Sequence, residues 1–153
     1  MNAQPLRYMI SCEPAMNNRV FGTLSWAGFL KDWDGPEPGE QPAAYIVVLV
    51  DTAVNPNADQ DVGIACQTML LGAAEQGLGG CMIGSIQRKE LAGILEIPDG
   101  HTIALVLALG APVEHVILEE ANSDASVKYY REPDGTHHVP KRRLADLILK
   151  SFT

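Results

Sequence analysis

The chain has 153 residues and a mass of 16.5 kDa, with 46% hydrophobic and 20% charged residues. This length suits one domain with a buried core, and the composition excludes a disordered or fibrous protein. A net charge of −8 and a pI near 4.8 disfavour general binding to the phosphate backbone of nucleic acid.

The charge is unevenly distributed along the chain. Residues 1–127 hold 5 Lys or Arg against 16 Asp or Glu, a balance of −11. Residues 128–153 hold 6 against 3, a balance of +3. A basic tail on an acidic body indicates either docking onto a partner chain or binding of a small anion.

Cysteines and hydrophobic runs point to a cytoplasmic protein. The three cysteines (Cys12, Cys66 and Cys81) are far apart and odd in number, so we expect buried, reduced thiols and no disulfide framework. No apolar run reaches the roughly 18–20 residues that span a membrane. The first residues also lack the charged start and apolar stretch of a signal peptide.

The first half of the chain predicts strands and helices in alternation. Residues 6–12 indicate a weak strand, and residues 14–24 a short helix. Residues 32–42 are rich in proline and glycine and predict a surface excursion. Residues 43–50 are continuously apolar and β-branched, which favours a strand buried on both faces.

The clearest helix follows this strand. Asn57 and Gln60 have the spacing of a capping box, and residues 62–74 carry no charge. A helix without a polar face must be covered all round, either by its own chain or by a second subunit. We favour a dimer. Gly77 is the expected C′ residue that ends the helix.

The remaining elements complete an α+β pattern. We expect strands at 81–83 and 104–109, with a helix at 88–95 between them. Pro133-Asp134-Gly135 predicts a turn between two strands, and residues 144–150 a closing helix. The fold predicted is a three-layer α/β/α sandwich with a mixed or antiparallel central sheet, in a single domain spanning 1–153.

Two motifs could bind a ligand, and each also has a purely structural interpretation. Glycines in the stretch 77–85 (GLGGCMIGS) let backbone N–H groups approach a phosphate or flat heterocycle. A tight turn would by itself also account for these glycines. The basic run Lys141-Arg142-Arg143 could grip a phosphate or form a solvated patch.

Other chemistries find little support. His137 and His138 are adjacent, so in a strand they point to opposite faces and do not share a metal easily; we expect no metal site. The sequence contains no GxSxG element or other nucleophile motif, so we expect no catalytic triad.

Taken in order, the motifs resemble the FMN-dependent nitroreductase family. The matching stretches cover most of the chain: residues 2–5 (NAQP), 43–52 (AAYIVVLVDT), 61–77, 77–86 (GLGGCMIGSI), 103–112 (IALVLALGAP) and 139–148 (VPKRRLADLI). The resemblance implies a homodimer with two FMN molecules at the subunit interface. It also implies an oxidoreductase in which NAD(P)H reduces FMN and a nitroaromatic or quinone-like acceptor then reoxidises it, in ping-pong order.

The resemblance also implies which residues bind FMN and which role each has. Asn2 and Gln4 belong to the N-x-Q-P element that lines the flavin site, where Leu6 replaces the usual tryptophan. Met82, Ile83, Gly84 and Ser85 match the segment against the isoalloxazine ring, with a backbone N–H of Gly84 or Ser85 near flavin N5. Lys141 and Arg143 match the pair that grips the phosphate. No catalytic side chain is implied.

Two features of the sequence leave the function and the role of one loop open to more than one interpretation. The family begins with a helical Arg-Arg-Ser-x-Arg segment, whereas this sequence opens within N-x-Q-P, so we expect an N-terminally truncated flavodomain. The alternative function is a dimeric scaffold that binds FMN weakly or not at all. Residues 26–42, with Trp26 and Trp33, indicate either a lid over a planar ligand or an anchored surface loop.

Overall fold

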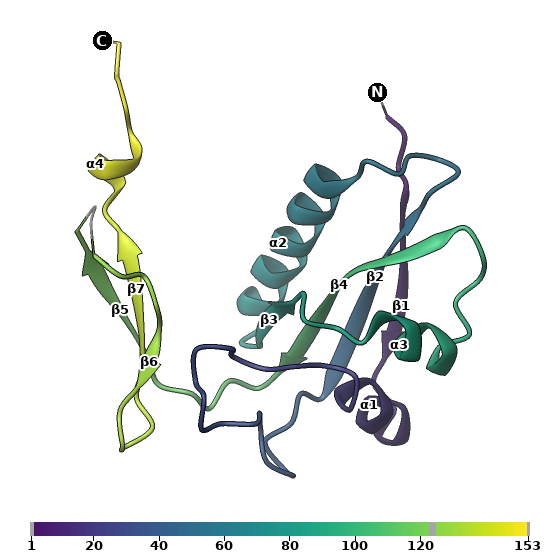
Figure 1. Ribbon diagram of the computed structural model, residues 1–153, viewed down its shortest axis with the longest axis horizontal. Helices are drawn as coiled ribbons and strands as arrows, with labels where there is room; N and C mark the ends of the chain where they lie inside the picture. Colours follow the sequence, from purple (N-terminus) through teal and green to yellow (C-terminus); the bar gives the residue numbers. More distant parts are fainter. Residues whose placement is uncertain (1, 123–124, 153) are drawn as a thin grey trace. The chain divides into compact units, whose positions relative to one another are not determined.

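The computed structural model describes residues 2–122 and 125–152. The chain forms two compact units, a larger one from Met1–Trp26 and Gly35–Pro112 and a smaller one from Ala27–Asp34 and Val113–Thr153. The larger unit contains β1 Leu6–Ser11, α1 Pro14–Phe21, β2 Ala44–Asp51, α2 Asp59–Glu75, β3 Gly79–Ile83, α3 Arg88–Ile94 and β4 His101–Gly110. The smaller unit contains β5 Val116–Ala121, β6 Tyr130–Arg131, β7 His137–Arg142 and α4 Leu144–Leu147 (Figure 1).

An antiparallel sheet is the centre of the larger unit. Its strand order is β1-β2-β4-β3, and every neighbouring pair runs antiparallel. The pairing of β2 with β4 is continuous except for an irregularity between Val48 and Leu49. This confirms the α+β prediction with an antiparallel central sheet.

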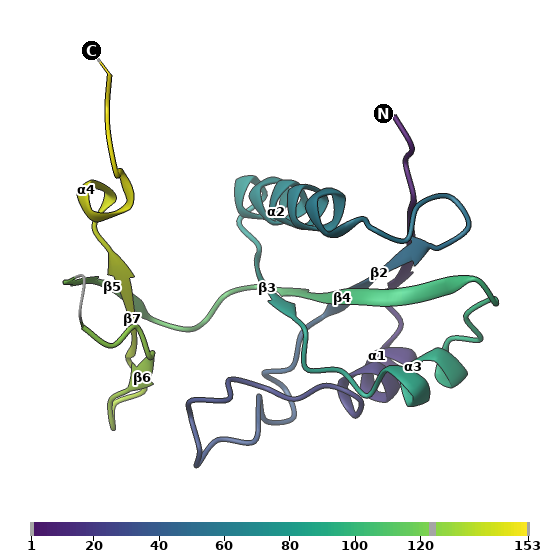
Figure 2. The same ribbon diagram turned by 45° about the horizontal axis from the view of Figure 1, so that its top comes forward.

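Both faces of this sheet are covered by helices, as Figure 2 shows for α2 on one face and α1 with α3 on the other. Val48 and Leu107 pack against Val62 and Cys66 of α2. The opposite face has a larger cluster, built from Val20, Leu24, Tyr45, Val47, Leu49, Ile83, Leu91, Ile103, Val106 and Ala108. Alternate residues of β2 enter opposite clusters, so the predicted burial of this strand on both faces is confirmed.

The start of α2 differs from the prediction. Ala58, which is 1% exposed, occupies the N-cap position and makes no side-chain cap hydrogen bond. Asn57 instead forms a local turn, in which its N–H donates to the Asn55 side chain (3.1 Å) and its carbonyl accepts from that side chain (3.1 Å). The capping-box prediction is therefore wrong, because burial of Ala58 fixes where the helix begins.

The end of α2 follows the prediction. Gly77 has φ = +73°, its N–H donates to Ala74, and the N–H of Leu78 donates to Ala73. These two bonds make a Schellman motif, which requires a left-handed residue at the position of Gly77.

The outward face of α2 carries large apolar side chains. Ile64 is 70% exposed and Leu71 is 63% exposed, whereas Val62 and Cys66 face the sheet. Within the larger unit, α2 is thus covered on one side only.

The first helix is shorter than predicted. The side chain of Glu13 caps it by accepting hydrogen bonds from the N–H groups of Ala15 (2.9 Å) and Met16 (2.6 Å). It ends at Phe21 instead of continuing to Leu24, because Leu24 forms a β-bridge with Ile86.

The smaller unit contains a three-stranded sheet, which we call the C-terminal sheet, with the order β5-β7-β6. β7 pairs in parallel with β5 and antiparallel with β6. The predicted turn between β6 and β7 is confirmed, since Gly135 has φ = +89° and its N–H donates to Glu132 (2.9 Å). The last helix is shorter than predicted, because the backbone is extended at Ile148.

The prediction for the cysteines holds in part. Cys66 is buried, but Cys12 and Cys81 are exposed, so the expectation that all three thiols are buried is wrong. Burial raises the pKa of the Cys66 thiol. Among the described residues, no helix has the length and apolar character needed to cross a membrane.

Candidate functional site

The segment after β3 exposes main chain at Gly84 and Ser85. The N–H of Ser25 donates to the carbonyl of Ser85 (3.0 Å), and the N–H of Gln87 donates to Thr23 (2.8 Å). These bonds fix the turn through the Ser85 carbonyl and the Gln87 N–H. Within residues 2–122 and 125–152, neither the Gly84 N–H nor the Ser85 N–H donates to another backbone group. Both residues are exposed, so two fixed donors are available to a ligand.

Three of the four glycines in the 77–85 stretch have separate roles. Gly77 serves the helix end through its positive φ. Gly80 serves packing, because a Cβ there would lie 2.6 Å from the carbonyl oxygen of Ala108 and 2.9 Å from Leu70. A Cβ at Gly84 would meet only Leu105, at an ordinary 3.7 Å. Of the three, Gly84 alone lacks a structural requirement and lies at an exposed turn.

The side chains of the neighbouring site residues differ in exposure. Met82 is 37% exposed, whereas Ile83 is buried in the core at 6%. Only the main chain of Ile83 is therefore accessible to a ligand. A side-chain contact from this segment would have to come from Met82 or Ser85.

The N-terminal site residues are joined to each other. The side-chain N–H of Gln4 donates to the side-chain oxygen of Asn2 (2.9 Å). Gln4 has φ = +52°, a left-handed conformation that residues other than glycine seldom adopt. Its carbonyl accepts from Arg7 (3.0 Å), and the carbonyl of Pro5 accepts from the N–H of Asp51 (2.8 Å). These bonds fix the entry into β1.

The basic segment lies at the end of β7 and the start of α4. Lys141 is in β7, and Arg143 is the N-cap residue of α4. The guanidinium of Arg143 donates two hydrogen bonds to the carboxylate of Asp146, at 2.9 and 3.0 Å. Asp146 raises the pKa of Arg143, and Arg143 in turn holds the pKa of Asp146 below its usual value. Lys141 makes no ion pair with any described residue.

The eight residues predicted for the cofactor thus form three local groups. Asn2 with Gln4, and the consecutive residues Met82–Ser85, belong to the larger unit. Lys141 and Arg143 belong to the smaller unit.

Comparison with known proteins decides the family. The Nitroreductase family model matches residues 37–111. This part of the chain belongs to the nitroreductase family. It contains β2, α2, β3, α3 and β4, and hence the glycine turn at Gly84.

Solved structures show that the fold is nitroreductase-like. A nitroreductase family protein from Clostridium novyi NT is 19% identical with a TM-score of 0.59, covering 71% of this chain and 62% of its own. An FMN-dependent nitroreductase from Clostridium difficile R20291 is 18% identical with a TM-score of 0.57, covering 72% and 65%. An NADPH:FMN oxidoreductase from Vibrio harveyi, solved with NAD+, is 21% identical with a TM-score of 0.54, covering 74% and 53%. The chain therefore spans less than two thirds of the length of these proteins.

A hollow of about 460 Å³ in the nitroreductase-like unit does not coincide with the predicted site. It is lined by Met9, Ile10, Ser11, Cys12, Glu13, Met16, Val20, Val47 and Leu95. None of the eight predicted cofactor residues lines it.

The 26–42 segment of this nitroreductase-like chain is anchored at both tryptophans. Trp26 lies 5.3 Å from the ring of Phe21, and a Cβ at Gly35 would come within 2.7 Å of it. The guanidinium of Arg131 lies over the ring of Trp33 at 4.6 Å. These contacts favour the anchored surface loop over a lid.

Two features of the site were not found from the sequence. The Arg143–Asp146 pair is one, although the Arg-x-x-Asp spacing at a helix start was a usable signal. The other is Tyr45, which is 1% exposed and whose hydroxyl has no hydrogen-bond partner among the described residues. Burial, with a smaller contribution from Cys81, raises the pKa of Tyr45 to about 12. Tyr45 therefore stays protonated near neutrality.

Proposed function

We propose that this chain is an FMN-dependent NAD(P)H oxidoreductase of the nitroreductase type. The observation that carries the proposal is the pair of exposed main-chain donors at Gly84 and Ser85, within the segment that matches the family. The solved structures with this fold include proteins named as FMN-dependent or NADPH:FMN enzymes.

The residues present fit FMN at both ends of the molecule. A ring that approaches Gly84 meets no Cβ, and the N–H groups of Gly84 or Ser85 suit an acceptor such as flavin N5. Lys141 and Arg143 offer a point charge and a planar fork to the phosphate. Asn2 and Gln4 supply amide groups that match the polar edge of the ring.

The chain's own task is to bind and orient. FMN, when bound, would supply the redox chemistry: hydride transfer from NAD(P)H and reduction of an electron-poor acceptor such as a nitroaromatic compound or a quinone. The fixed donors of Gly84 and Ser85 stabilise negative charge that develops near them, at no cost of reorganisation. We assign no side chain as acid or base.

We further propose that the working form is a homodimer. Ile64 and Leu71 expose apolar surface on one side of α2, and the small residues Gly63 and Gly72 on the same helix leave room for a close neighbour. A contiguous exposed apolar face of this kind marks an interface. In the dimer, residues of both chains would contact each FMN.

The test is to purify the protein and record its flavin absorbance. FMN or riboflavin is then added, and NADH and NADPH oxidation are followed with a quinone or nitroaromatic acceptor. The proposal predicts FMN uptake, tighter binding of FMN than of riboflavin, and oxidation of the nicotinamide. A protein that takes up no FMN and oxidises neither nucleotide would instead be a dimeric scaffold.

A further inference from the structure

A short segment before β1, residues 2–4, carries two exposed amide side chains, and we call it the amide arm. Asn2 and Gln4 are both exposed, and the Gln4 side-chain N–H donates to the side-chain oxygen of Asn2 (2.9 Å). The same two side chains also carry an acceptor, the Gln4 oxygen, and a donor, the Asn2 nitrogen. A heterocycle whose edge alternates carbonyl and N–H groups needs partners of both kinds. Where these two amides point therefore decides how well such an edge is bound.

The backbone of the amide arm is strained at Gln4. Its φ of +52° is left-handed, which residues other than glycine seldom adopt. Pro5 follows it and is fully buried, and a residue before proline normally has an extended backbone. A conformation of this kind persists only where the surrounding groups hold it. The bonds to the backbone on either side of Gln4 are thus what keeps the arm in place.

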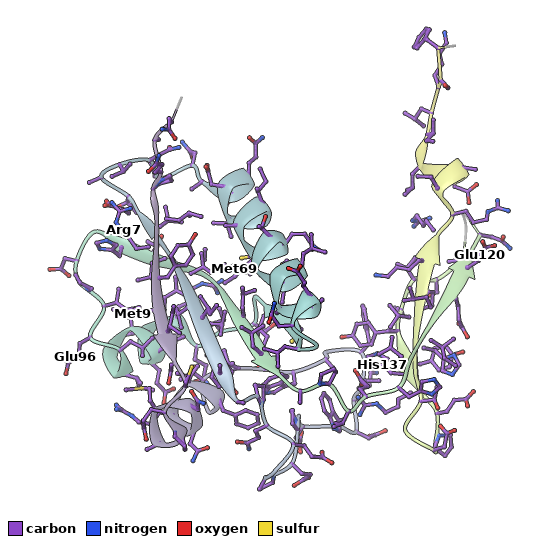
Figure 3. All side chains as sticks on the ribbon, turned by 180° about the vertical axis from the view of Figure 1, so that it is seen from behind. Arg7, Met9, Met69, Glu96, Glu120 and His137 are labelled. Carbon is purple, nitrogen blue, oxygen red and sulfur yellow. The ribbon has the colours of Figure 1, made fainter. Side chains whose placement is uncertain are left out.

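Arg7 supplies two of these bonds. One terminal nitrogen of its guanidinium donates to the carbonyl of Gln4 (3.0 Å) and to the carbonyl of Leu6 (2.9 Å). Arg7 lies near the start of β1, at the edge of the four-stranded sheet (Figure 3). Its side chain is 47% exposed, so packing alone does not fix the guanidinium. It needs a partner to hold it over these carbonyls.

Asp51, at the end of β2, is that partner and holds the arm in two ways. Its carboxylate accepts from the other terminal nitrogen of Arg7 (3.1 Å), and its backbone N–H donates to the carbonyl of Pro5 (2.8 Å). The antiparallel register pairs Arg7 with Leu49, which makes Asp51 its diagonal neighbour. The Asp51 side chain is only 18% exposed, and the N–H of Ala53 donates to its second oxygen (3.2 Å). The carboxylate is therefore itself held in place.

We propose that Arg7 and Asp51 are positioning residues that hold the amide arm in the conformation in which it meets the flavin ring. Asp51 orients the guanidinium, and the guanidinium holds the carbonyl of the left-handed Gln4, from which the amide projects. This inference rests on the proposed function, because contact between the arm and the ring is part of it. The order of the arm itself is a property of the chain alone and can be measured without flavin.

The first test measures backbone order in the full chain by ¹⁵N relaxation, without flavin. In the natural sequence, the amides of Ala3 and Gln4 should have order parameters near about 0.85. Arg7→Met removes the guanidinium and keeps an unbranched side chain, and these values should fall below about 0.6. Asp51→Asn should lower them less, and combining the two changes should add nothing to Arg7→Met, because the Asp51 carboxylate acts through Arg7. Residues 44–50 should stay ordered in every variant.

The second test measures flavin affinity with the same variants. If the arm is correctly placed only a third to a tenth of the time, binding weakens by about three- to tenfold. Because the arm meets the ring, Arg7→Met should weaken FMN and riboflavin by the same factor. Loss of positive charge alone would weaken FMN more, since only FMN carries the phosphate. The matched control is Arg19→Met, which removes an exposed arginine of the larger unit and should change neither affinity.

The two tests fail in distinguishable ways. Order parameters that do not change in Arg7→Met would overturn the proposal, whether or not flavin binds. A disordered arm with unchanged affinity for both flavins would also overturn it, and so would a loss confined to FMN. If the natural chain bound neither flavin, the proposed function and the positioning role would both be wrong. The order parameters would then still decide whether Arg7 and Asp51 hold the arm.

Discussion

Arg143 and Asp146 face each other as a two-pronged ion pair, with Nε and one terminal nitrogen of the guanidinium each bound to a different carboxylate oxygen. This is the geometry in which a guanidinium binds a phosphate. Asp146 therefore competes with any anion for this edge of Arg143. The variant Asp146→Asn should bind FMN about two- to fivefold more tightly, the range for an exposed ion pair, and its affinity for riboflavin should be unchanged. Weaker FMN binding by this variant in a fluorescence titration would show that Asp146 assists the phosphate instead.

The basic segment should distinguish FMN from riboflavin. Changing Lys141→Ala and Arg143→Ala together removes two charge-assisted contacts, each about 1.5–3 kcal/mol, so FMN affinity should fall by at least about 100-fold. Riboflavin, which lacks the phosphate, should bind as before. The matched control is Arg19→Ala with Lys89→Ala, which removes the same charge from exposed positions of the larger unit. If FMN and riboflavin weaken equally, the assignment of this segment is wrong.

Gly80, within β3, and Gly84, directly after it, should respond differently to alanine. Gly80→Ala places a Cβ against the backbone of Ala108, and overpacking of this kind costs about 1–3 kcal/mol of unfolding free energy. Gly84→Ala meets only Leu105 at ordinary distance and should change stability by less than about 0.5 kcal/mol. Urea denaturation of both variants measures this difference. If Gly84→Ala loses as much stability as Gly80→Ala, the fold itself requires a glycine at position 84.

The outer face of α2 should control assembly. Ile64→Asp with Leu71→Asp places two charges on the proposed interface and should convert a dimer to a monomer in sedimentation velocity. Val54→Asp changes an exposed apolar residue outside α2 and serves as the control. A dimer that survives the double change would contradict the proposed interface.

Tyr45 should make the fold sensitive to alkali. Its pKa is raised to about 12, so its contribution to stability is complete below the ordinary tyrosine pKa of about 10 and is lost as the pH rises toward 12. Tyr45→Phe removes both this loss and a hydroxyl without a described partner. In urea denaturation at about pH 11, the free energy of unfolding of this variant should exceed that of the natural sequence by about 1–2 kcal/mol. At about pH 8 the difference should be smaller. Tyr8→Phe, at an exposed position, should show no such gain.

Much of the larger unit could be predicted because its signals are local and strong. The continuous apolar run of β2 and the glycine at the end of α2 each have one dominant physical interpretation. The start of α2 could not be read, because burial of Ala58 outweighs the side-chain capping that Asn57 suggested. β5 was not predicted, since its sequence VILEEA lacks alternation and it pairs in parallel with the distant β7.

The candidate site was predictable as motifs but not as individual roles. Sequence spacing does not distinguish Gly80, which tight packing requires, from Gly84, which exposes its main chain. The burial of Ile83 in the core depends on strand register, which the sequence does not state.

The most direct measurement is an NMR titration that follows the backbone amides as FMN is added, repeated with riboflavin. The account predicts that FMN shifts the resonances of Gly84, Ser85, Lys141 and Arg143 together at one affinity. Riboflavin should shift only those of Gly84 and Ser85. Binding of FMN that leaves Gly84 and Ser85 unchanged would contradict the central claim that their main chain holds the flavin ring.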